Sequence, residues 1–462
     1  MHASSTRKVR RDVTGGKRGD GHLRTRRICR PDARRFKTRA DERNLTGVAG
    51  LVSFGGFLRE LGVDRELRQR FRRLKASRLV VYPMETQLRL LLDAAVAGVG
   101  RVFGLESLAA DPLFVHLAGG VVPSIDTVYR DLMRFDDTAL DDLEAMLGAH
   151  GLAGLAHKKH PLVHLDIDTT VLSLFGTQEG ALPGPNPHYH GRPSYHPLVA
   201  RIAETGTFVG ARLRPGDTGF GVAEVPVLEG WLDRVRAEVG PDGVIYVRID
   251  GAADCTDILM AIEAKGALFV TKADMTPRLN GLIATEEHWT TVERDADNRP
   301  SQQVAEIPFA REAWKQRGAN FRVIAVRTRE RPNGKQIFLW DHLDYTVQVF
   351  ITNEWAEAPI DVARRYDARA GIEPMIGETK YGWGLGNVPS QCFRANHAAL
   401  LLKLLAFNFM RRFVATRCPA LRTWRAPWLR RALIHVPGRL SRSGHRRTLH
   451  VPVTSMLARM PN

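Results

Sequence analysis

The first 150 residues alternate between apolar and polar positions at a helical period. Apolar residues recur three and four positions apart in METQLRLLLDAAVAGV (84–99), LESLAADPLFVHLAG (105–119) and PSIDTVYRDLMRF (123–135), which predicts a run of short helices over 46–150. Ser124 stands where an N-cap is expected, because its hydroxyl can accept a hydrogen bond from the first turn. Such helices suit either a helix-turn-helix that reads DNA or plain packing, and the pattern leaves both open.

From residue 161 the residue pattern changes from helical to strand-like. Four segments are rich in β-branched and apolar residues and are bounded by turns: PLVHLDIDTTVLSLFG (161–176), TGTFVGARLRPGD (205–217), VIYVRID (244–250) and ALFVTKAD (267–274). Two amphipathic helices are predicted among them, over 225–239 and 254–266. Strands followed by a strand–helix–strand unit indicate a mixed α/β sheet.

The last part of the chain divides into three regions. Residues 275–343 are polar and irregular, with strand-like pieces FRVIAVRTRE and KQIFLWD around a turn at RPNGK, and we interpret them as an inserted β subdomain. A strand over 344–354, a helix over 358–380 and an apolar helix over 396–413 follow. The apolar runs are too short to span a membrane.

The charge distribution along the chain indicates a possible binding partner. The chain of 462 residues has a net charge of +17, of which residues 1–40 carry +11 and residues 411–462 carry +12, so the middle is slightly acidic at −6. Arginine-rich ends favour phosphate binding, although solvated tails would have the same composition. Residues 1–45 are polar and basic, which predicts a disordered arm. Four scattered cysteines without a C-x-x-C pair favour a cytoplasmic protein with no disulfide framework.

Two aspartates end apolar strands, Asp168 in HLDIDTT and Asp250 in VRIDGAAD. Carboxylates at one edge of a sheet can share a metal ion, and oxygen-only ligands suit Mg²⁺ or Mn²⁺. Asp166 lies two positions earlier and shares a face with Asp168 on a strand. We prefer Asp168 because it lies beside the hydroxyls of Thr169 and Thr170 at the end of the apolar run. An aspartate that merely caps a turn is the alternative for either position.

A third acid stands in RRYDARAGIEPMIGETKYGWGL (364–385). On a helix, Tyr366, Arg369, Glu373 and Lys380 fall within about 60° of arc, whereas Glu378 falls about 120° from Tyr366. One carboxylate beside two cations and a phenol suits a metal-bound phosphate, although ordinary surface ion pairs would share this spacing. Pro374 follows Glu373, and proline inside a helix bends it, so the direction of Lys380 is the least fixed.

These residues resemble a known family. Tyr366-x2-Arg369-x3-Glu373-x6-Lys380 is similar to the YREK signature of DDE transposases from bacterial insertion sequences, and Asp168-Thr169-Thr170 and Asp250 are similar to the first two acids of that family. The resemblance also includes GPNPHYHGRPSYHPL (184–198), GLGNVPSQCFRANHAALLLKLLAFNF (384–409) and HVPGRLSRSGHRRTLHVP (435–452). It covers residues 46 to 452.

The resemblance implies an RNase H-like mixed-sheet α/β catalytic core with an inserted β subdomain, preceded by a helical DNA-binding region. The implied domains are an arm (1–45), a helical domain (46–150), a catalytic domain (160–274 and 344–410), the β insert (275–343) and an arginine-rich tail (411–462). It implies cut-and-paste transposition by a homodimer on double-stranded DNA, meaning the inverted-repeat ends and the target, with no membrane partner and a location in the bacterial cytoplasm at the nucleoid.

The resemblance also assigns roles to residues. Asp168, Asp250 and Glu373 would bind two Mg²⁺ ions, with Mn²⁺ as a substitute, while Tyr366, Arg369 and Lys380 would contact DNA phosphates. A tryptophan of the β insert would hold a flipped base, and the candidates are Trp289, Trp314 and Trp340. From its place after a strand, Lys272 could face a phosphate or plain solvent. A metal-dependent nuclease on the same fold and a catalytically inactive DNA-binding descendant are the competing functions.

Overall fold

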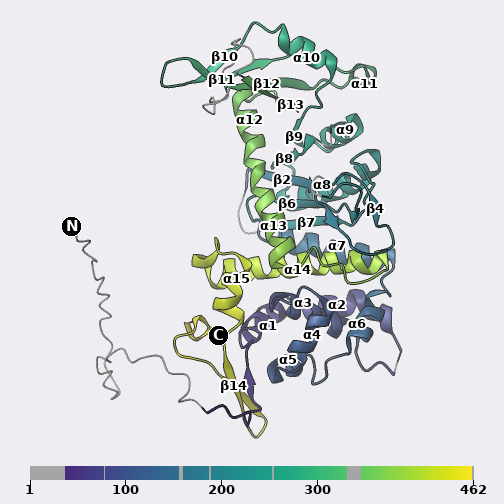
Figure 1. Cartoon of the computed structure of the whole chain (residues 1–462), viewed down its shortest axis with the longest axis vertical. Helices are drawn as coiled ribbons and strands as arrows, with labels where there is room; N and C mark the ends of the chain where they lie inside the picture. The colour runs from purple at the N-terminus through teal and green to yellow at the C-terminus, as the bar shows by residue number, and fades with distance from the viewer. Residues whose placement is uncertain are drawn as a thin grey trace, which may run out of the picture. The chain divides into compact units, whose positions relative to one another are not determined.

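The computed structural model describes residues 37–77, 79–155, 160–186, 189–251, 254–329 and 345–459. The chain divides into two units, Met1–Arg43 and Asn44–Asn462. The fold described below is that of the second unit, whose elements are labelled in Figure 1.

A nine-stranded mixed sheet is the centre of the fold. Across the sheet the order is β10 (Thr290–Arg294), β11 (Pro300–Glu306), β12 (Arg322–Arg329), β13 (Tyr345–Thr352), β9 (Leu268–Lys272), β8 (Val244–Ile249), β2 (Leu162–Thr169), β6 (Leu198–Ile202) and β7 (Thr207–Arg212). The β2–β8 and β8–β9 pairs are parallel, and the other neighbouring pairs are antiparallel. Counted along the chain, the five strands from β7 to β9 have the order 3-2-1-4-5. This arrangement confirms the predicted RNase H-like mixed α/β core.

Helices cover both faces of this sheet. On one face, α8 (Val225–Val239) and α9 (Thr256–Ala264) bury Trp231, Leu232 and Ile258 against the central strands. On the other face, α12 (Pro359–Asp367) packs Val362, Ala363 and Tyr366 on residues of β8, β9, β12 and β13. The central strands are therefore apolar on both sides, which is why their sequences are nearly continuous hydrophobic runs.

The strands of the predicted β insert continue the same sheet. β12 pairs with β13 over eight residues, from Arg322 opposite Thr352 to Arg329 opposite Tyr345, and β11 and β10 follow outward. Two short helices accompany them, α10 (Pro277–Ala284) and α11 (Glu312–Gln316). The expected turn at 331–335 and the strand-like piece KQIFLWD lie outside the described residues. The division of the chain into the five domains given above stays a prediction.

The N-terminal part is helical, as its periodicity predicts. Its helices are α1 (Leu51–Glu60), α2 (Val63–Phe71), α3 (Met84–Val96), α4 (Leu105–Ala109), α5 (Pro112–Leu117), α6 (Ile125–Leu132) and α7 (Asp137–Leu152), with 3-10 turns at Arg72–Lys75 and Val102–Gly104. The Ser124 hydroxyl accepts a hydrogen bond from the Thr127 amide, which confirms the predicted N-cap of α6. Helices α3, α6 and α7 pack on α14 (Phe393–Arg417), a long helix whose middle is buried.

The arginine-rich C-terminal segment is folded. After α14 come α15 (Ala426–Leu429), a π-helical turn (Arg430–Ile434) and a hairpin of β14 (Gly438–Ser443) and β15 (Arg446–His450), which β1 (Leu45–Thr46) extends to a three-stranded sheet. Arg430 is buried and donates hydrogen bonds to the carbonyls of Ala95, Val96 and Gly382. Some of these arginines thus hold helices together instead of facing solvent.

The remaining elements are a small sheet, several short turns and α13. A second small sheet has the order β3 (Leu172–Ser173), β5 (Pro193–Tyr195) and β4 (Leu182–Pro183). Short helical turns occur at Val222–Glu224, Ala368–Gly371, Pro419–Leu421 and Met456–Arg459, and α13 covers Ile372–Gly382. Within the described part of the chain, no helix has the length and apolar character needed to cross a membrane.

Candidate functional site

Parallel pairing of β2 and β8 places two aspartates side by side. Ile167 of β2 lies opposite Ile249 of β8, so the next residues, Asp168 and Asp250, leave neighbouring strands at the same edge. Adjacent strands lie about 4.8 Å apart, and each aspartate accepts a hydrogen bond from the amide that follows it, Thr169 or Gly251, at 2.8 Å. The strand ends thus bring together two carboxylates that are 82 positions apart in the chain.

The helix predicted over 358–380 is divided into three segments. α12 ends at Asp367, a 3-10 turn covers Ala368–Gly371, and α13 begins at Ile372. Pro374 therefore stands in the first turn of α13, where a missing amide hydrogen costs no intrahelical bond. The break explains how the helix tolerates proline beside Glu373. Figure 1 shows α12 and α13 following one another from the β10–β13 strands to α14.

The 3-10 turn carries Arg369 to the two aspartates. Its Nη2 lies 3.4 Å from Oδ1 of Asp168 and 3.4 Å from Oδ1 of Asp250. The side chain of Arg369 is only 6% exposed, and its Nε has no hydrogen-bond partner. A buried guanidinium between two carboxylates is the main positive charge that neutralises them here.

Tyr366 and Lys272 lie on the Asp250 side of this group. The Tyr366 hydroxyl donates a hydrogen bond to Oδ1 of Asp250 at 3.3 Å. The ammonium of Lys272, at the end of β9, lies 5.4 Å from the centre of the Tyr366 ring, a cation–π distance. Lys272 thus lies beside a residue that contacts Asp250.

A cavity of about 890 Å³ opens over the carboxylates. Asp168, Asp250, Arg369, Glu373 and Lys380 all line it. Glu378 points elsewhere, because its Oε1 accepts a hydrogen bond from the amide of Ala426. The structure therefore separates the two glutamates as the helical-wheel argument predicts, and it brings five of the predicted site residues into one cavity.

Burial and like charges set the ionisation of the site. Burial raises the pKa of Asp168 to about 6; the positive charge of Arg369 opposes this shift, and the negative charges of Asp250 and Glu373 add to it. Burial also lowers the pKa of Lys380, while the charge of Asp168 acts in the opposite direction. The excess of negative charge around Asp168 is the condition under which a divalent cation is attracted.

The donor set suits a hard divalent ion, but its present arrangement does not form a metal cluster. In the described ranges, no group of three or more histidine, cysteine, aspartate or glutamate side chains is arranged to hold a metal ion. The reason is visible in the contacts: Arg369 lies between Asp168 and Asp250, and Glu373 lines the cavity without joining that pair. Carboxylate oxygens alone still match Mg²⁺ or Mn²⁺ in chemistry.

Comparison with known proteins gives a family. The model of the transposase DDE domain group 1 family matches residues 30–460. The chain belongs to this family. A comparison with curated proteins gave no match. Among solved structures, the chain is similar to the piggyBac transposase synaptic complex with hairpin DNA, at 10% sequence identity and a TM-score of 0.43, over 83% of this chain and 78% of that one.

In this member of the DDE family, Asp166 has a structural place. It is fully buried, its Oδ1 lies 2.6 Å from Nε of Arg248, and its Oδ2 lies 3.5 Å from Nη1 of Arg201. Alternation along β2 places both aspartates on the same face, so their position along the strand distinguishes them. Asp166 lies within the sheet opposite Arg201 and Arg248, and Asp168 lies near the strand end. Asp168 lines the cavity, while Asp166 neutralises two buried arginines.

Trp314 and Trp289 differ in their surroundings. Trp314 is fully buried and makes edge-to-face contacts with Phe309 and Phe321, so it forms part of the core. Trp289 is half-buried; its Nε1 donates to the Glu286 carbonyl, and the Arg327 guanidinium lies 4.1 Å from its ring. Protein contacts thus enclose the Trp314 indole, and a guanidinium lies over the Trp289 ring. Trp340 lies outside the described residues.

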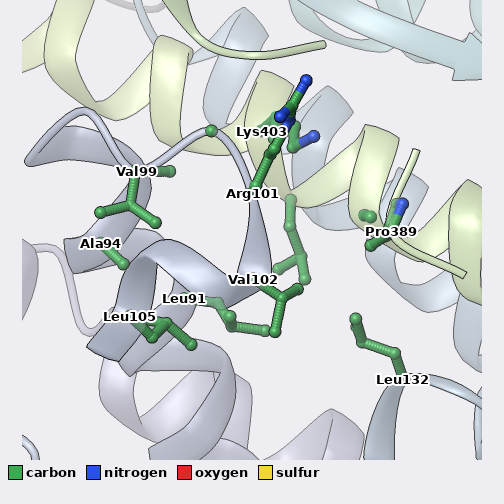
Figure 2. A pocket seen from close by; sticks show the side chains of 13 residues that line it. Leu91, Ala94, Val99, Arg101, Val102, Leu105, Leu132, Pro389 and Lys403 are labelled. Carbon is green, nitrogen blue, oxygen red and sulfur yellow. The ribbon is translucent and has the colours of Figure 1, made fainter. Parts of the chain in front are cut away.

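A second, mostly apolar pocket lies between the N-terminal helices and α14 (Figure 2). Its lining includes Leu91, Val102, Leu105 and Leu132, together with two cations, Arg101 and Lys403. It contains no carboxylate, so it is not the place where phosphate chemistry would occur.

Lys403 supports the loop that borders the catalytic cavity. Its ammonium donates to the carbonyls of Gly384 and Asn387 at 2.6 and 2.7 Å, and Nε of Arg101 donates to Oδ1 of Asn387 at 3.0 Å. Burial lowers the pKa of Lys403 to about 7, and the charge of Arg101 adds to this shift. A mid-helix lysine in an apolar run is the signal that could have identified this support.

Several cavity residues were not singled out from the sequence. Ser173, Asn186, Tyr189 and Asn387 also line the wall around the acids. Asn186 and Tyr189 belong to the Pro- and Gly-rich segment 184–198, for which the family resemblance gives a general match but no residue roles. Only the folding of this segment over the strand ends reveals their place.

Proposed function

We propose that this chain is a transposase that binds the inverted-repeat ends of an insertion sequence and catalyses metal-dependent DNA cleavage and strand transfer. The observation that supports it most is the shared cavity of Asp168, Asp250 and Glu373 at the carboxyl ends of parallel strands. Family membership supports the reaction class. The DNA, the metal and the residue roles belong to this proposal.

Each cavity residue has a task in this mechanism. Asp168, Asp250 and Glu373 would hold the divalent ions, Mg²⁺ or Mn²⁺. When bound, two such metal ions would stabilise the attacking and leaving oxygens of a phosphodiester. Lys380 would bind a phosphate oxygen from the α13 side, and Arg369 would turn from the aspartates to a phosphate once the ions neutralise those acids. Tyr366 would keep Asp250 oriented through its hydrogen bond.

The remaining parts of the chain would supply DNA binding. The helical domain over 46–150 and the basic arm over 1–45 would hold the double-stranded ends, and two copies would pair two ends. The cellular place for such a protein is the bacterial cytoplasm, at the nucleoid. The high positive charge supports these assignments through sequence-independent phosphate binding.

The deciding experiment is a strand-transfer assay with the gene's flanking ends and a supercoiled target plasmid, in Mg²⁺ and separately in Mn²⁺. A transposase cleaves the ends and joins them to the target. Cleavage without joining would indicate a metal-dependent nuclease on this fold. End binding without cleavage by the wild type would indicate an inactive descendant. Asp168→Asn serves as the matched control, since it should bind ends and cleave none.

A further inference from the structure

A further cavity, lined by Phe103 and Phe175 among others, adjoins the catalytic cavity. The cavity over the carboxylates measures about 890 Å³, and a neighbouring one measures about 500 Å³. The two share Ser173, Gly386 and Asn387 in their walls. Together they form one trench that leads from the acids, past the loop after α13, to the turn at Val102–Gly104.

Exposed aromatic rings line this trench. Phe175 is 83% exposed, Phe103 is 53% exposed and Tyr189 is 50% exposed. Phe175 and Phe103 border the outer cavity, and Tyr189 borders the inner one. Single exposed apolar residues are ordinary on protein surfaces, but three rings along one trench that begins at a phosphate-type site form a gathered surface that needs a partner.

Guanidinium groups accompany the rings. The Arg192 guanidinium carbon lies 4.5 Å from the centre of the Phe175 ring and 4.7 Å from that of Tyr189, so one arginine contacts a ring of each cavity. Arg101 lies 5.9 Å from the centre of the Phe103 ring. Nucleic-acid bases stack on such rings and guanidinium planes. The guanidinium charges also neutralise the phosphates that link the bases.

We propose that this trench binds an unpaired DNA strand next to the cleavage point, with bases stacked on Phe175 and Tyr189 and phosphates near Arg192 and Arg101. The inference rests on the proposed function, because the strand is taken to enter from the carboxylate cavity. It assigns base stacking to the segment between β2 and β6 rather than to a tryptophan of the β10–β12 strands.

The chemistry of the trench selects an unpaired strand over a duplex. In a duplex the faces of the bases are already stacked on one another, so exposed rings gain little from it. An unpaired strand offers free base faces and one negative charge per nucleotide, which match the rings and the arginines in turn. A purely apolar ligand would leave the arginine charges without a partner.

Binding to a pair of probes tests the proposal. The probes are a mixed-sequence oligodeoxynucleotide of about 12 nucleotides and an abasic sugar-phosphate chain of the same length, measured by fluorescence anisotropy without divalent metal. The wild-type chain should prefer the base-carrying probe by about tenfold or more. Phe175→Ala and Tyr189→Ala should each lose most of this preference while keeping the affinity for the abasic chain, because phosphate contacts remain.

Three further variants serve as controls. Trp355→Ala removes an aromatic residue that is 54% exposed and does not line either cavity, so it should keep the full preference. Phe175→Leu removes the ring but keeps an apolar side chain; it should behave like Phe175→Ala, while Phe175→Trp should restore the preference. Thermal melting identifies any variant that fails to fold. The folded variants then test the proposal.

The outcomes separate this inference from the proposed function. A wild type that cleaves and joins ends, but whose preference for bases survives in Phe175→Ala, Phe175→Leu and Tyr189→Ala, overturns the trench proposal and leaves the transposase intact. A wild type without any base preference overturns it as well. A wild type that prefers bases through these rings, yet cleaves no DNA in either metal, overturns the proposed reaction but retains the strand-binding trench.

Discussion

Nη2 of Arg369 lies 3.4 Å from Oδ1 of Asp168. The same nitrogen lies 3.4 Å from Oδ1 of Asp250, so a single guanidinium contacts both acids at the strand ends. A metal ion and Arg369 therefore have the same electrostatic task at this edge of the sheet. The two cations should compete for the carboxylates, and DNA phosphates offer Arg369 another partner when the metal is bound.

This competition predicts the behaviour of Arg369→Gln. Without the guanidinium, Asp168 and Asp250 repel each other at neutral pH, so the metal-free variant should melt at a lower temperature than the wild type. Added Mn²⁺ should raise the melting temperature of the variant more than that of the wild type, because the ion relieves a larger repulsion. Differential scanning fluorimetry measures both shifts. An equal Mn²⁺ shift in the two proteins would contradict the shared task.

The two glutamates of α13 should differ in function. Glu373→Gln should reduce DNA cleavage by about 100-fold or more, because it removes a cavity carboxylate. Glu378→Gln should cleave normally and change stability by less than about 1 kcal/mol, because the glutamine carbonyl oxygen can still accept the Ala426 amide outside the cavity. A plasmid-nicking assay with both variants measures this difference. Similar losses of activity would sink the assignment of Glu373.

Asp166 and Asp168 should differ in stability. Asp166→Asn leaves the buried Arg248 and Arg201 without their carboxylate, which should cost on the order of 3–5 kcal/mol. Asp168→Asn should change stability by less than about 1 kcal/mol, because Arg369 keeps Asp250 as a partner. Urea unfolding measured by circular dichroism compares them. The idea fails if Asp166→Asn unfolds at the wild-type midpoint.

The buried His397 predicts an acid-sensitive fold. Burial lowers its pKa to about 4; the Ala211 carbonyl and the charges of Asp141 and Asp137 oppose this shift, and the charge of Arg212 adds to it. The unfolded imidazole titrates near pH 6.5, so its contribution to stability is complete above that pH and is lost as the pH falls toward 4. The loss is on the order of 3 kcal/mol.

Removing the imidazole provides the measurement. His397→Gln should flatten the fall of the unfolding free energy between pH 6.5 and 4. The exposed His445 provides a control, since His445→Gln should leave the wild-type slope. A slope unchanged in His397→Gln would assign the acid sensitivity to other groups.

The basic N-terminal arm should act through phosphates. Deleting residues 1–40, which carry a net charge of +11, should weaken DNA binding and flatten its salt dependence. Each phosphate contact that is lost reduces the slope of log K against log salt by about 0.9. Titrations at several salt concentrations give the slope. An unchanged slope would show that the arm makes no phosphate contact.

How much of this could be predicted from the sequence depends on the range of each interaction. The strands ending at Asp168 and Asp250 are local patterns, and so is the separation of Glu373 from Glu378 by helical angle. The opposition of Ile167 and Ile249 is a long-range register, and no local pattern specifies it. The family resemblance supplied that link in its place.

Tertiary packing decided the remaining cases. The family resemblance makes Trp314 a candidate for base stacking, but Phe309 and Phe321 pack against its ring in the core. Pro374 looked disruptive, but a 3-10 turn ends just before α13 and places it in a first turn. Tyr189 and Asn186 had no signal of their own, because loops acquire their neighbours only when the strands beneath them pair.

The small sheet of β1, β14 and β15 joins the two basic regions of the chain. β1 begins at Leu45, the last residue of the predicted arm, and Thr46 pairs with Gly438 at the base of the hairpin. The hairpin carries exposed arginines such as Arg442, Arg446 and Arg447. The arm is covalently continuous with β1. If the hairpin and the arm each bind DNA weakly, binding by one would raise the effective concentration of the other, and the combined affinity would be high.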